Sequence, residues 1–218
     1  MIRNAANTNQ TLFYQPHFNN LPVMTDKGPL ITEYLAGLQQ AMHAALADYN
    51  RVFAFRVDIR FPDDLMSYEI YNSNEVIQRF LASFIAKINH ARKVSAANYG
   101  RSHPCVVRYA WAREVGHDGK PHYHLVFLLN NDAYCTVGKY EQGRENIFNR
   151  LEGALASALR VSVEQVAGLV EIPRQSSYCL LRNDPCTWGD FFYRASYLTK
   201  VATKYFGNGL HAFGYSQR

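Results

Sequence analysis

The sequence predicts an α+β fold, with a central antiparallel sheet and flanking helices, on three observations. Residues 52–61 alternate apolar and polar side chains over their second half, as a strand with one buried face does. Residues 105–115 and 121–129 are strand-like and are joined by a short Gly-Asp-Gly turn, which predicts a hairpin. Segments with helical spacing lie before, between and after these strands. Helices mixed with a hairpin favour an antiparallel sheet over a doubly wound parallel one.

The composition fits a folded domain with a basic surface. The chain has 218 residues, of which 48% are hydrophobic and 19% are charged, enough apolar material for a core. The formal net charge of +5 is compatible with a nucleic-acid partner. Because there is no secretory signal pattern and no apolar run long enough for a bilayer, we expect a cytoplasmic protein without a membrane partner. The four cysteines lack metal-binding spacing, so we expect reduced thiols.

The first predicted elements are an arm, a helix and a strand. Residues 1–30 are rich in Asn, Thr and Pro without a period, which indicates an extended N-terminal arm, and residues 31–218 are expected to form one domain. Residues 31–49 have helical spacing. In the strand that follows, one face carries Phe55, Val57, Ile59 and Phe61, and the other carries Arg56, Asp58 and Arg60. The polar face is a candidate functional surface.

A second helix and a basic loop are expected before the hairpin. Asn72 and Glu75 predict the start of an amphipathic helix, whose apolar stripe ends at Ile88. The residues that follow are basic and are expected to form a loop, with Arg92, Lys93 and Arg101 as its cations. After the hairpin, we expect a helix over 145–159 and short strands within 168–172 and 178–181.

The last predicted element is a helix that opens at Thr187, three residues before Asp190, and runs to Phe206. Tyr193, Tyr197, Lys200 and Lys204 are spaced by four, three and four residues, which places them in an arc of roughly 60°. Phe191, Ala195, Leu198, Ala202 and Tyr205 fall on the opposite side and are expected to bury the helix. An ordinary solvated face also explains the stripe of tyrosines and lysines.

Two histidines on the hairpin form the second candidate site. His122 and His124 are one residue apart on a strand, so both side chains lie on one face, while Leu125, Phe127 and Leu129 lie on the other. Two imidazoles on one face can bind one metal ion. A histidine pair alone is short of a full ligand set, and ordinary surface positions also explain it.

The two candidate sites make chemical sense together. A tyrosine hydroxyl attacks poorly at its free pKa of about 10, and neighbouring lysines favour the phenolate. A divalent metal held by the histidines would polarise a phosphate at the same place. The combination predicts transfer of one DNA end to a tyrosine, a link that conserves bond energy for later rejoining.

At these residues the sequence resembles a known family. His122-Tyr-His124 in an apolar strand is similar to the motif of the HUH endonucleases, and Tyr193-x3-Tyr197-x2-Lys200 is similar to the two-tyrosine motif of their rolling-circle replication initiators. The stretches Phe55 to Pro62 and Arg194 to Lys200 resemble the replication proteins of filamentous phages and their prophage relatives, the YagK/YfjJ C-terminal domain family. The resemblance spans roughly residues 50–206.

The resemblance implies a fold, a reaction and a ligand set. It implies a sheet related to the RRM fold, and nicking and rejoining of single-stranded DNA through a 5′-phosphotyrosine, which starts rolling-circle replication of a phage, prophage or plasmid. It supplies Glu114 as the third ligand, and Mg²⁺ or Mn²⁺ as the ion. Tyr197 is the expected first nucleophile, Tyr193 the second, and Lys200 their catalytic neighbour.

Several alternatives stay open. His117 is a rival third ligand on a loose turn. Asp58 either orients a ligand histidine or pairs with Arg56 or Arg60. A zinc hydrolase that uses Cys105 or Cys135 matches no common zinc spacing. A domesticated prophage protein that binds DNA hairpins without cutting them is the other class of function.

The expected partner is single-stranded DNA or a DNA hairpin at an origin. A host helicase is also expected, because the chain has no GxxxxGK[ST] loop for a motor of its own. The cations expected to contact phosphates are Lys204, Arg194, Arg56, Arg60, Arg92, Lys93 and Arg101.

Overall fold

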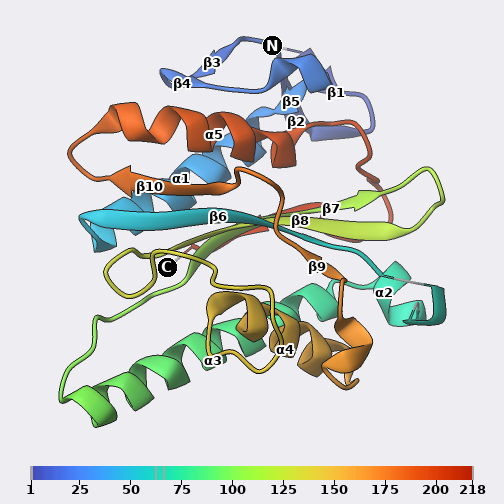
Figure 1. The fold of residues 1–218 in the computed structure, drawn as a ribbon. Coiled ribbons are helices and arrows are strands. Elements are labelled where there is room, and N and C mark those ends of the chain that lie inside the picture. The colour runs from blue at the N-terminus through green and yellow to red at the C-terminus, as the bar shows by residue number, and fades with distance from the viewer. Residues whose placement is uncertain (1, 62, 66, 218) are drawn as a thin grey trace.

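The described residues of the computed structural model, 2–61, 63–65 and 67–217, form a central antiparallel sheet with helices on both faces (Figure 1). Its six described strands are β6 (Arg51–Ile59), β7 (Arg108–Val115), β8 (Pro121–Asn130), β9 (Val170–Glu171), β10 (Ser177–Leu181) and β11 (Phe213–Tyr215). They lie in the order β10-β6-β8-β7-β11, and β9 also pairs with β6. The predicted fold class and the antiparallel hairpin of β7 and β8 are confirmed.

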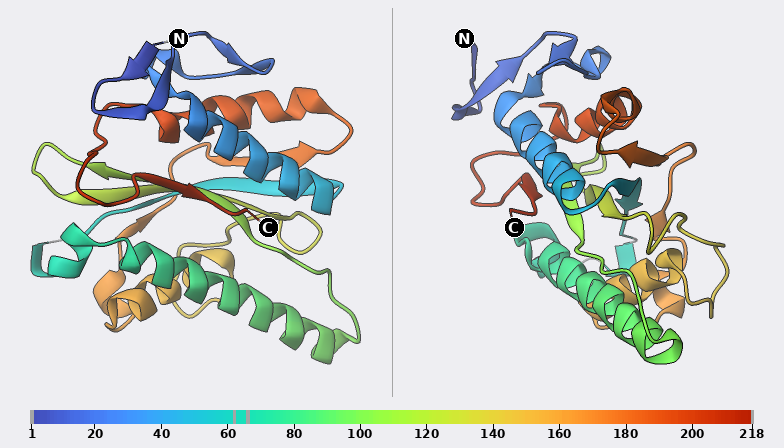
Figure 2. Two further views of the ribbon diagram at one scale, coloured as in Figure 1. Left: turned by 180° about the vertical axis from the view of Figure 1, so that it is seen from behind. Right: turned by 90° about the vertical axis from the view of Figure 1, so that its left-hand side faces the viewer.

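The two faces of the sheet are covered by different helices. Helices α3 (Glu75–Tyr99) and α4 (Ile147–Leu159) cover one face, and α1 (Thr32–Asp48) and α5 (Gly189–Ser196) cover the other. Figure 2 shows α1 on the side of the sheet away from α3. As the alternation predicts, Phe55 and Val57 of β6 pack with α3 and α4, whereas Ala54 packs on the α5 side. The long strands therefore present one set of alternate residues to the face that α1 and α5 cover.

The N-terminal residues form paired strands. Strands β1 (Ile2–Asn4), β2 (Asn7–Phe13) and β5 (Leu30–Ile31) make a small sheet, β3 (His17–Phe18) pairs with β4 (Leu21–Pro22), and a 3₁₀ turn follows at Thr25–Lys27. Both carboxylate oxygens of Glu33 on α1 accept from the backbone N–H of Thr11, and Met24 N–H donates to Ser196 on α5. The predicted arm is extended backbone, but it is held against the domain by partners distant in sequence.

Helix α3 corrects the predicted basic loop. The whole helix has 25 residues and runs to Tyr99, well past the predicted end at Ile88. Gly100 caps it with a φ of 70°, the left-handed geometry that glycine adopts readily. The residues after Ile88 are rich in helix formers, and these extend the helix beyond its apolar stripe. Arg92 and Lys93 therefore lie on a helix, and Arg101 directly follows it.

Helix α5 corrects the predicted last helix. It ends at Ser196, a 3₁₀ turn follows at Tyr197–Thr199, and Lys200 is extended with ψ 148°. Val201 N–H donates to the Pro29 carbonyl, so the chain pairs with the N-terminal segment instead of continuing the helix. The expected burial of Ala202 and Tyr205 is wrong for the same reason, since Tyr205 is 63% exposed.

The shorter elements include α2 (Tyr68–Asn72) and 3₁₀ turns at Asp63–Leu65, Glu164–Val166 and Pro185–Trp188. The side chain of Asp184, rather than Thr187, caps the last of these turns by accepting from Cys186 N–H. Pro62, expected within the motif after β6, lies outside the described residues. The cysteines are free, and none of the described helices has the length and apolar character needed to span a bilayer.

Candidate metal centre and tyrosine site

The hairpin brings two histidines and a glutamate together on the α5 side of the sheet. In the ladder between β7 and β8, Glu114 lies opposite His122, and His124 lies opposite Ala112. His124 also lies opposite Asp58 of β6. Since these positions alternate with Tyr123 and Leu125, which pack on the α3 side, all the polar side chains face α5.

Glu114, His122 and His124 form a group that can hold a metal ion, with one ligand atom from each residue lying within 4.8 Å of the others. Oε2 of Glu114 is 3.7 Å from Nε2 of His122 and 3.5 Å from Nε2 of His124. The Nε2 atom of His124 is buried and has no hydrogen-bond partner, as a nitrogen reserved for a metal would be. The side chain of His122 is 22% exposed, so the group is open to solvent on one side.

Asp58 settles the orientation of His124. Its Oδ1 is 2.8 Å from Nδ1 of His124, and it also accepts two hydrogen bonds of 2.9 Å from Arg56. Burial opposes ionisation of Asp58, but His124 and Arg56 outweigh it and hold its pKa below the usual value. With Nδ1–H donating to this carboxylate, the lone pair of Nε2 is free for a metal. Asp58 thus fills both of the roles expected for it, orienting His124 and pairing with Arg56.

Glu114 is surrounded by donors from the segment after α5. Lys200 Nζ lies 2.9 Å from Oε2, Lys204 Nζ lies 3.3 Å from Oε1, and the Thr203 hydroxyl donates to Oε2 over 2.6 Å. Burial alone would raise the pKa of Glu114, but the neighbouring imidazoles of His122 and His124 and the charge of Lys204 hold it well below the usual range. Burial lowers the pKa of Lys204 to about 8 against the opposing effect of Glu114.

Lys204 was expected to contact DNA phosphates, and its burial contradicts this expectation. The side chain of Lys204 is 0% exposed and pairs with Glu114. It is therefore not a surface contact for DNA phosphates. The helix-based prediction placed it on an exposed stripe, which requires the helix to continue past Ser196. Thr203 was not predicted as a site residue, because no local pattern in the sequence marks it.

Tyr193 and Tyr197 lie in different surroundings. The Tyr197 ring lies 5.4 Å from the His124 ring in an edge-on arrangement, with Lys200 Nζ 3.5 Å and Arg56 Cζ 4.8 Å from its centroid. Tyr193 is 39% exposed and lines a depression with Tyr178 and Arg194, one turn earlier on α5. Tyr197 therefore lies next to His124 of the metal-binding group, whereas Tyr193 lines a separate depression one turn earlier.

The rival ligands do not join the group. His117 is exposed in the turn between β7 and β8. Cys105 is buried in the core on the α3 side, and Cys135 is exposed. Within the described ranges, the cluster around Glu114 therefore contains two imidazoles and one carboxylate, without a thiol.

The expected DNA-binding cations divide between the two faces of the sheet. Arg56 and Arg194 lie on the α5 side, and Arg60 is exposed just after β6. Arg92 on α3 donates to the Tyr134 hydroxyl over 3.0 Å, and its guanidinium lies over that ring. The α3 cations Arg92 and Lys93, with Arg101, are thus separated from the metal-binding group by the sheet (Figure 1).

Fold and site together define an α+β protein whose antiparallel sheet carries a potential metal centre beside a tyrosine. Residues 13–216 match the YagK/YfjJ C-terminal domain family, and the chain belongs to this family. It is 33% identical over 199 residues to the uncharacterized protein YagK of Escherichia coli strain K12, covering 87% of this chain and 95% of YagK. It is 30% identical over 200 residues to the uncharacterized protein YfjJ of the same strain, covering 87% and 96%. No solved structure matches the chain.

Proposed function

We propose that the protein is a metal-dependent enzyme that nicks and rejoins single-stranded DNA through a 5′-phosphotyrosine and so initiates rolling-circle replication of a phage, prophage or plasmid. One observation carries the proposal. The Tyr197 ring lies against His124, whose free Nε2 belongs to the metal-binding group. A tyrosine nucleophile beside a metal-polarised phosphate is the arrangement that this reaction requires.

In this mechanism, the Tyr197 oxygen forms a bond to phosphorus while the bond from phosphorus to the 3′ oxygen breaks. The products are a free 3′-hydroxyl and a DNA 5′ end on the tyrosine, and attack by a 3′-hydroxyl reverses the step. A bound divalent ion supplies Lewis-acid polarisation of the phosphate. Lys200 offsets negative charge beside the Tyr197 ring, and Asp58 keeps His124 in the ligating tautomer.

The donor set suggests which ions are suitable. Two imidazoles and one carboxylate suit Mn²⁺ as well as or better than Mg²⁺, because magnesium prefers oxygen ligands. Lys200 and Lys204 already neutralise Glu114, so the ion must compete with two ammonium groups for this carboxylate. We therefore propose Mn²⁺ or Mg²⁺ as cofactor, with Mn²⁺ binding more tightly.

The proposed substrate is a single strand, or a hairpin with a single-stranded flank, at an origin. A tyrosine between a helix and a sheet needs an accessible phosphate, which blunt duplex does not offer. Unwinding would come from a host helicase, and the proposed place of action is the cytoplasm, where this DNA is found.

The test is incubation of the protein with short single-stranded oligonucleotides and Mn²⁺, followed by a denaturing gel. A covalent protein–DNA band that needs the metal and disappears with EDTA is expected. Tight hairpin binding without this band, across a panel of oligonucleotides from the protein's own replicon, would instead indicate a binding protein that does not cut.

Asp58→Asn is expected to weaken Mn²⁺ binding by about 10- to 100-fold, because an amide replaces the carboxylate that orients His124. Isothermal titration calorimetry measures this. Asp132→Asn is the matched control, since Asp132 pairs with Arg51 at the other end of β6 and lies far from the metal-binding group. Equal Mn²⁺ affinity in Asp58→Asn and wild type would contradict the orienting role.

The cations near the end of α3 are expected to bind a flanking DNA segment rather than the cleaved phosphate. A double variant, Lys93→Gln with Arg101→Gln, should bind a hairpin with long flanks more weakly and with a salt slope smaller by about 1–2. It should bind an oligonucleotide that only reaches Tyr197 as wild type does. Fluorescence anisotropy at several salt concentrations measures both, and equal losses on both substrates would refute the division.

A further inference from the structure

Helix α3 is longer than α4, its neighbour on the same face of the sheet. The Ala158 carbonyl near the C-terminus of α4 accepts from Arg79 Nε, and a Cβ at Gly153 would lie 3.5 Å from Lys87 Nζ, so the two helices are antiparallel. The N-terminus of α4 therefore faces the C-terminal half of α3, which extends past it (Figure 1). Beyond this point, the loop that precedes α4 lies opposite α3.

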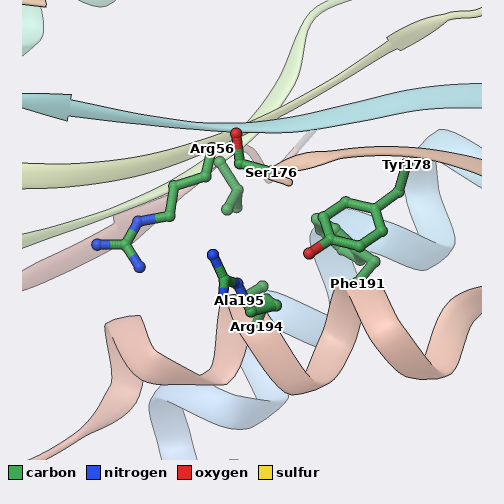
Figure 3. A pocket seen from close by; sticks show the side chains of 7 residues that line it. Arg56, Ser176, Tyr178, Phe191, Arg194 and Ala195 are labelled. Carbon is green, nitrogen blue, oxygen red and sulfur yellow. The ribbon is translucent and has the colours of Figure 1, made fainter. Parts of the chain in front are cut away.

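An open groove runs between α3 and this loop. It has a volume of about 720 Å³, and an adjoining hollow of about 400 Å³ at the end of α3 shares Arg92, Ser95 and Tyr99 with it. Such volumes are typical of binding sites. By contrast, the space between the sheet and α5 that Arg56 and Arg194 line in Figure 3 is only about 10 Å³, the size needed for one water molecule. The groove therefore has room for a ligand that the space in Figure 3 lacks.

The groove is strongly basic. No Asp or Glu occurs between residues 76 and 113, a stretch that includes most of α3. Five cations and one carboxylate line the groove and the adjoining hollow, an excess of four positive charges. The cations are Lys87, Arg92, Arg101, Arg144 and Arg150, and the carboxylate is Glu145. The formal net charge of the whole chain is +5, so this surface carries an excess nearly as large.

The carboxylates near the groove are loosely held. Glu145 is 93% exposed and lies 4.0 Å from Arg150, and the pair of Glu141 with Arg144 has both side chains more than half exposed. Ion pairs with such exposed carboxylates contribute little to stability. Lys87 has no carboxylate partner in the described part of the chain. An anionic ligand can therefore reach these cations by displacing weak pairs only.

The loop wall of the groove is held in place by hydrogen bonds to the first turn of α4. Asn146 Nδ2 donates to the Lys139 carbonyl over 2.8 Å, and Asn149 Nδ2 donates to the Glu141 carbonyl over 2.9 Å. The Asn146 side chain also accepts from Asn149 N–H and so caps α4. Because the loop is fixed to the helix, Arg144 stays at the groove, and the positive end of the α4 dipole adds to its charge.

An aromatic ring lies where the groove meets the adjoining hollow. Tyr99 is the last residue of α3 and lines both spaces. It is 78% exposed, the highest value among the large apolar side chains of the described residues. Its ring can stack on an unpaired base, which a duplex or an acidic peptide does not offer. Cations along a groove with an exposed ring therefore favour a single-stranded nucleic acid.

We propose that this groove is a second DNA-binding site, which holds a single-stranded segment by contacts from its cations to phosphates and by stacking of a base on Tyr99. Lys87 and Arg144, from the two walls, contact neighbouring phosphates. The choice of DNA rests on the proposed function, whereas the preference for an unpaired polyanion rests on the groove alone. Since α3 and α5 cover opposite faces of the sheet, the groove and Tyr197 lie on opposite sides of the molecule (Figure 1). One protein molecule can therefore hold two short strands at once.

The first arm of the test measures the groove by itself, in EDTA, so that neither metal nor nicking is involved. Irradiation with a single-stranded oligonucleotide of about eight nucleotides that carries 5-iodouracil should crosslink it to Tyr99, which peptide mapping identifies. The crosslink yield at increasing oligonucleotide concentration gives the affinity of the groove. A protein without a crosslink at Tyr99 would overturn the proposal.

The charge contacts are tested in the same assay. Lys87→Gln with Arg144→Gln should weaken crosslinking and lower its salt slope by about 1.4, because two phosphate contacts to a single strand are lost. Lys27→Gln with Arg160→Gln, distant from the groove, is the control with the same change of net charge. Equal slopes in the two double variants would overturn the phosphate contacts.

Competition identifies the class of ligand. Unlabelled single-stranded DNA should suppress the crosslink, whereas blunt duplex and polyglutamate of equal charge should be much weaker competitors. Equal suppression by duplex would overturn the assignment to an unpaired strand, and equal suppression by polyglutamate would indicate a site for acidic proteins instead.

Counting bound strands separates this inference from the proposed activity. By native mass spectrometry, Tyr99→Ala should hold one short oligonucleotide fewer than wild type, since loss of one stacked base weakens a site about 5- to 150-fold. Tyr14→Ala, at another exposed tyrosine, should hold as many as wild type. Loss of one strand in Tyr99→Ala, in a protein that forms no phosphotyrosine adduct, would contradict the nicking proposal alone. Adduct formation with equal strand counts in Tyr99→Ala and wild type would contradict the groove alone.

Discussion

Tyr197→Phe is expected to abolish the covalent protein–DNA adduct, lowering its rate of formation by at least about 10³-fold. The substitution removes only the hydroxyl, and the ring contacts with His124, Lys200 and Arg56 remain possible. The folded structure should therefore persist, which thermal unfolding checks. Mass-spectrometric peptide mapping of the wild-type adduct should place the DNA on Tyr197.

Tyr193→Phe is the matched variant, on α5 one turn before the 3₁₀ turn that carries Tyr197. Tyr193 lies one turn before Tyr197 and is 39% exposed, and we propose that it acts after the first transfer. This variant should form a first adduct at close to the wild-type rate but fail to transfer the strand in a second step. An adduct on Tyr193 alone would reverse the roles of the tyrosines, and an adduct on neither would contradict the mechanism.

His124→Ala is expected to reduce Mn²⁺ affinity by about 100-fold or more and to remove metal-dependent nicking. The substitution removes one of the proposed ligands itself. Loss of a group that only orients a ligand already lowers metal affinity by about 10- to 100-fold. Isothermal titration calorimetry gives the affinity. Mn²⁺ should raise the melting temperature of wild type, because it binds the folded state, and should have little effect on the variant.

The choice of His124 rather than Glu114 follows from their surroundings. Removing the charge of Glu114 would leave the buried Lys204 without its partner, a loss of about 3–5 kcal/mol that could unfold the domain. After His124→Ala, Asp58 still has its two hydrogen bonds from Arg56. His117→Ala, in the exposed turn, is the control. Mn²⁺ affinity unchanged by His124→Ala would rule out the proposed ligand set.

Local sequence patterns determine the centre of this molecule. The period of two in a strand places His122 and His124 on one face, and the short turn places Glu114 opposite His122. The alternation in β6 likewise puts Asp58 on the polar face. These features depend on residues close together in the chain, so their geometry can be derived without the rest of the fold.

Tertiary structure decides the surroundings of that centre. Helical spacing continues past Ser196, but pairing of Val201 with Pro29 ends the helix and turns Lys200, Thr203 and Lys204 onto Glu114. The groove along α3 depends on how α4 and the loop before it pack beside that helix. Contacts between residues far apart in sequence leave no periodic trace, because each depends on which partner the folded chain supplies. The sequence by itself therefore determines the candidate ligands, and the fold decides which charges and hydroxyls surround them.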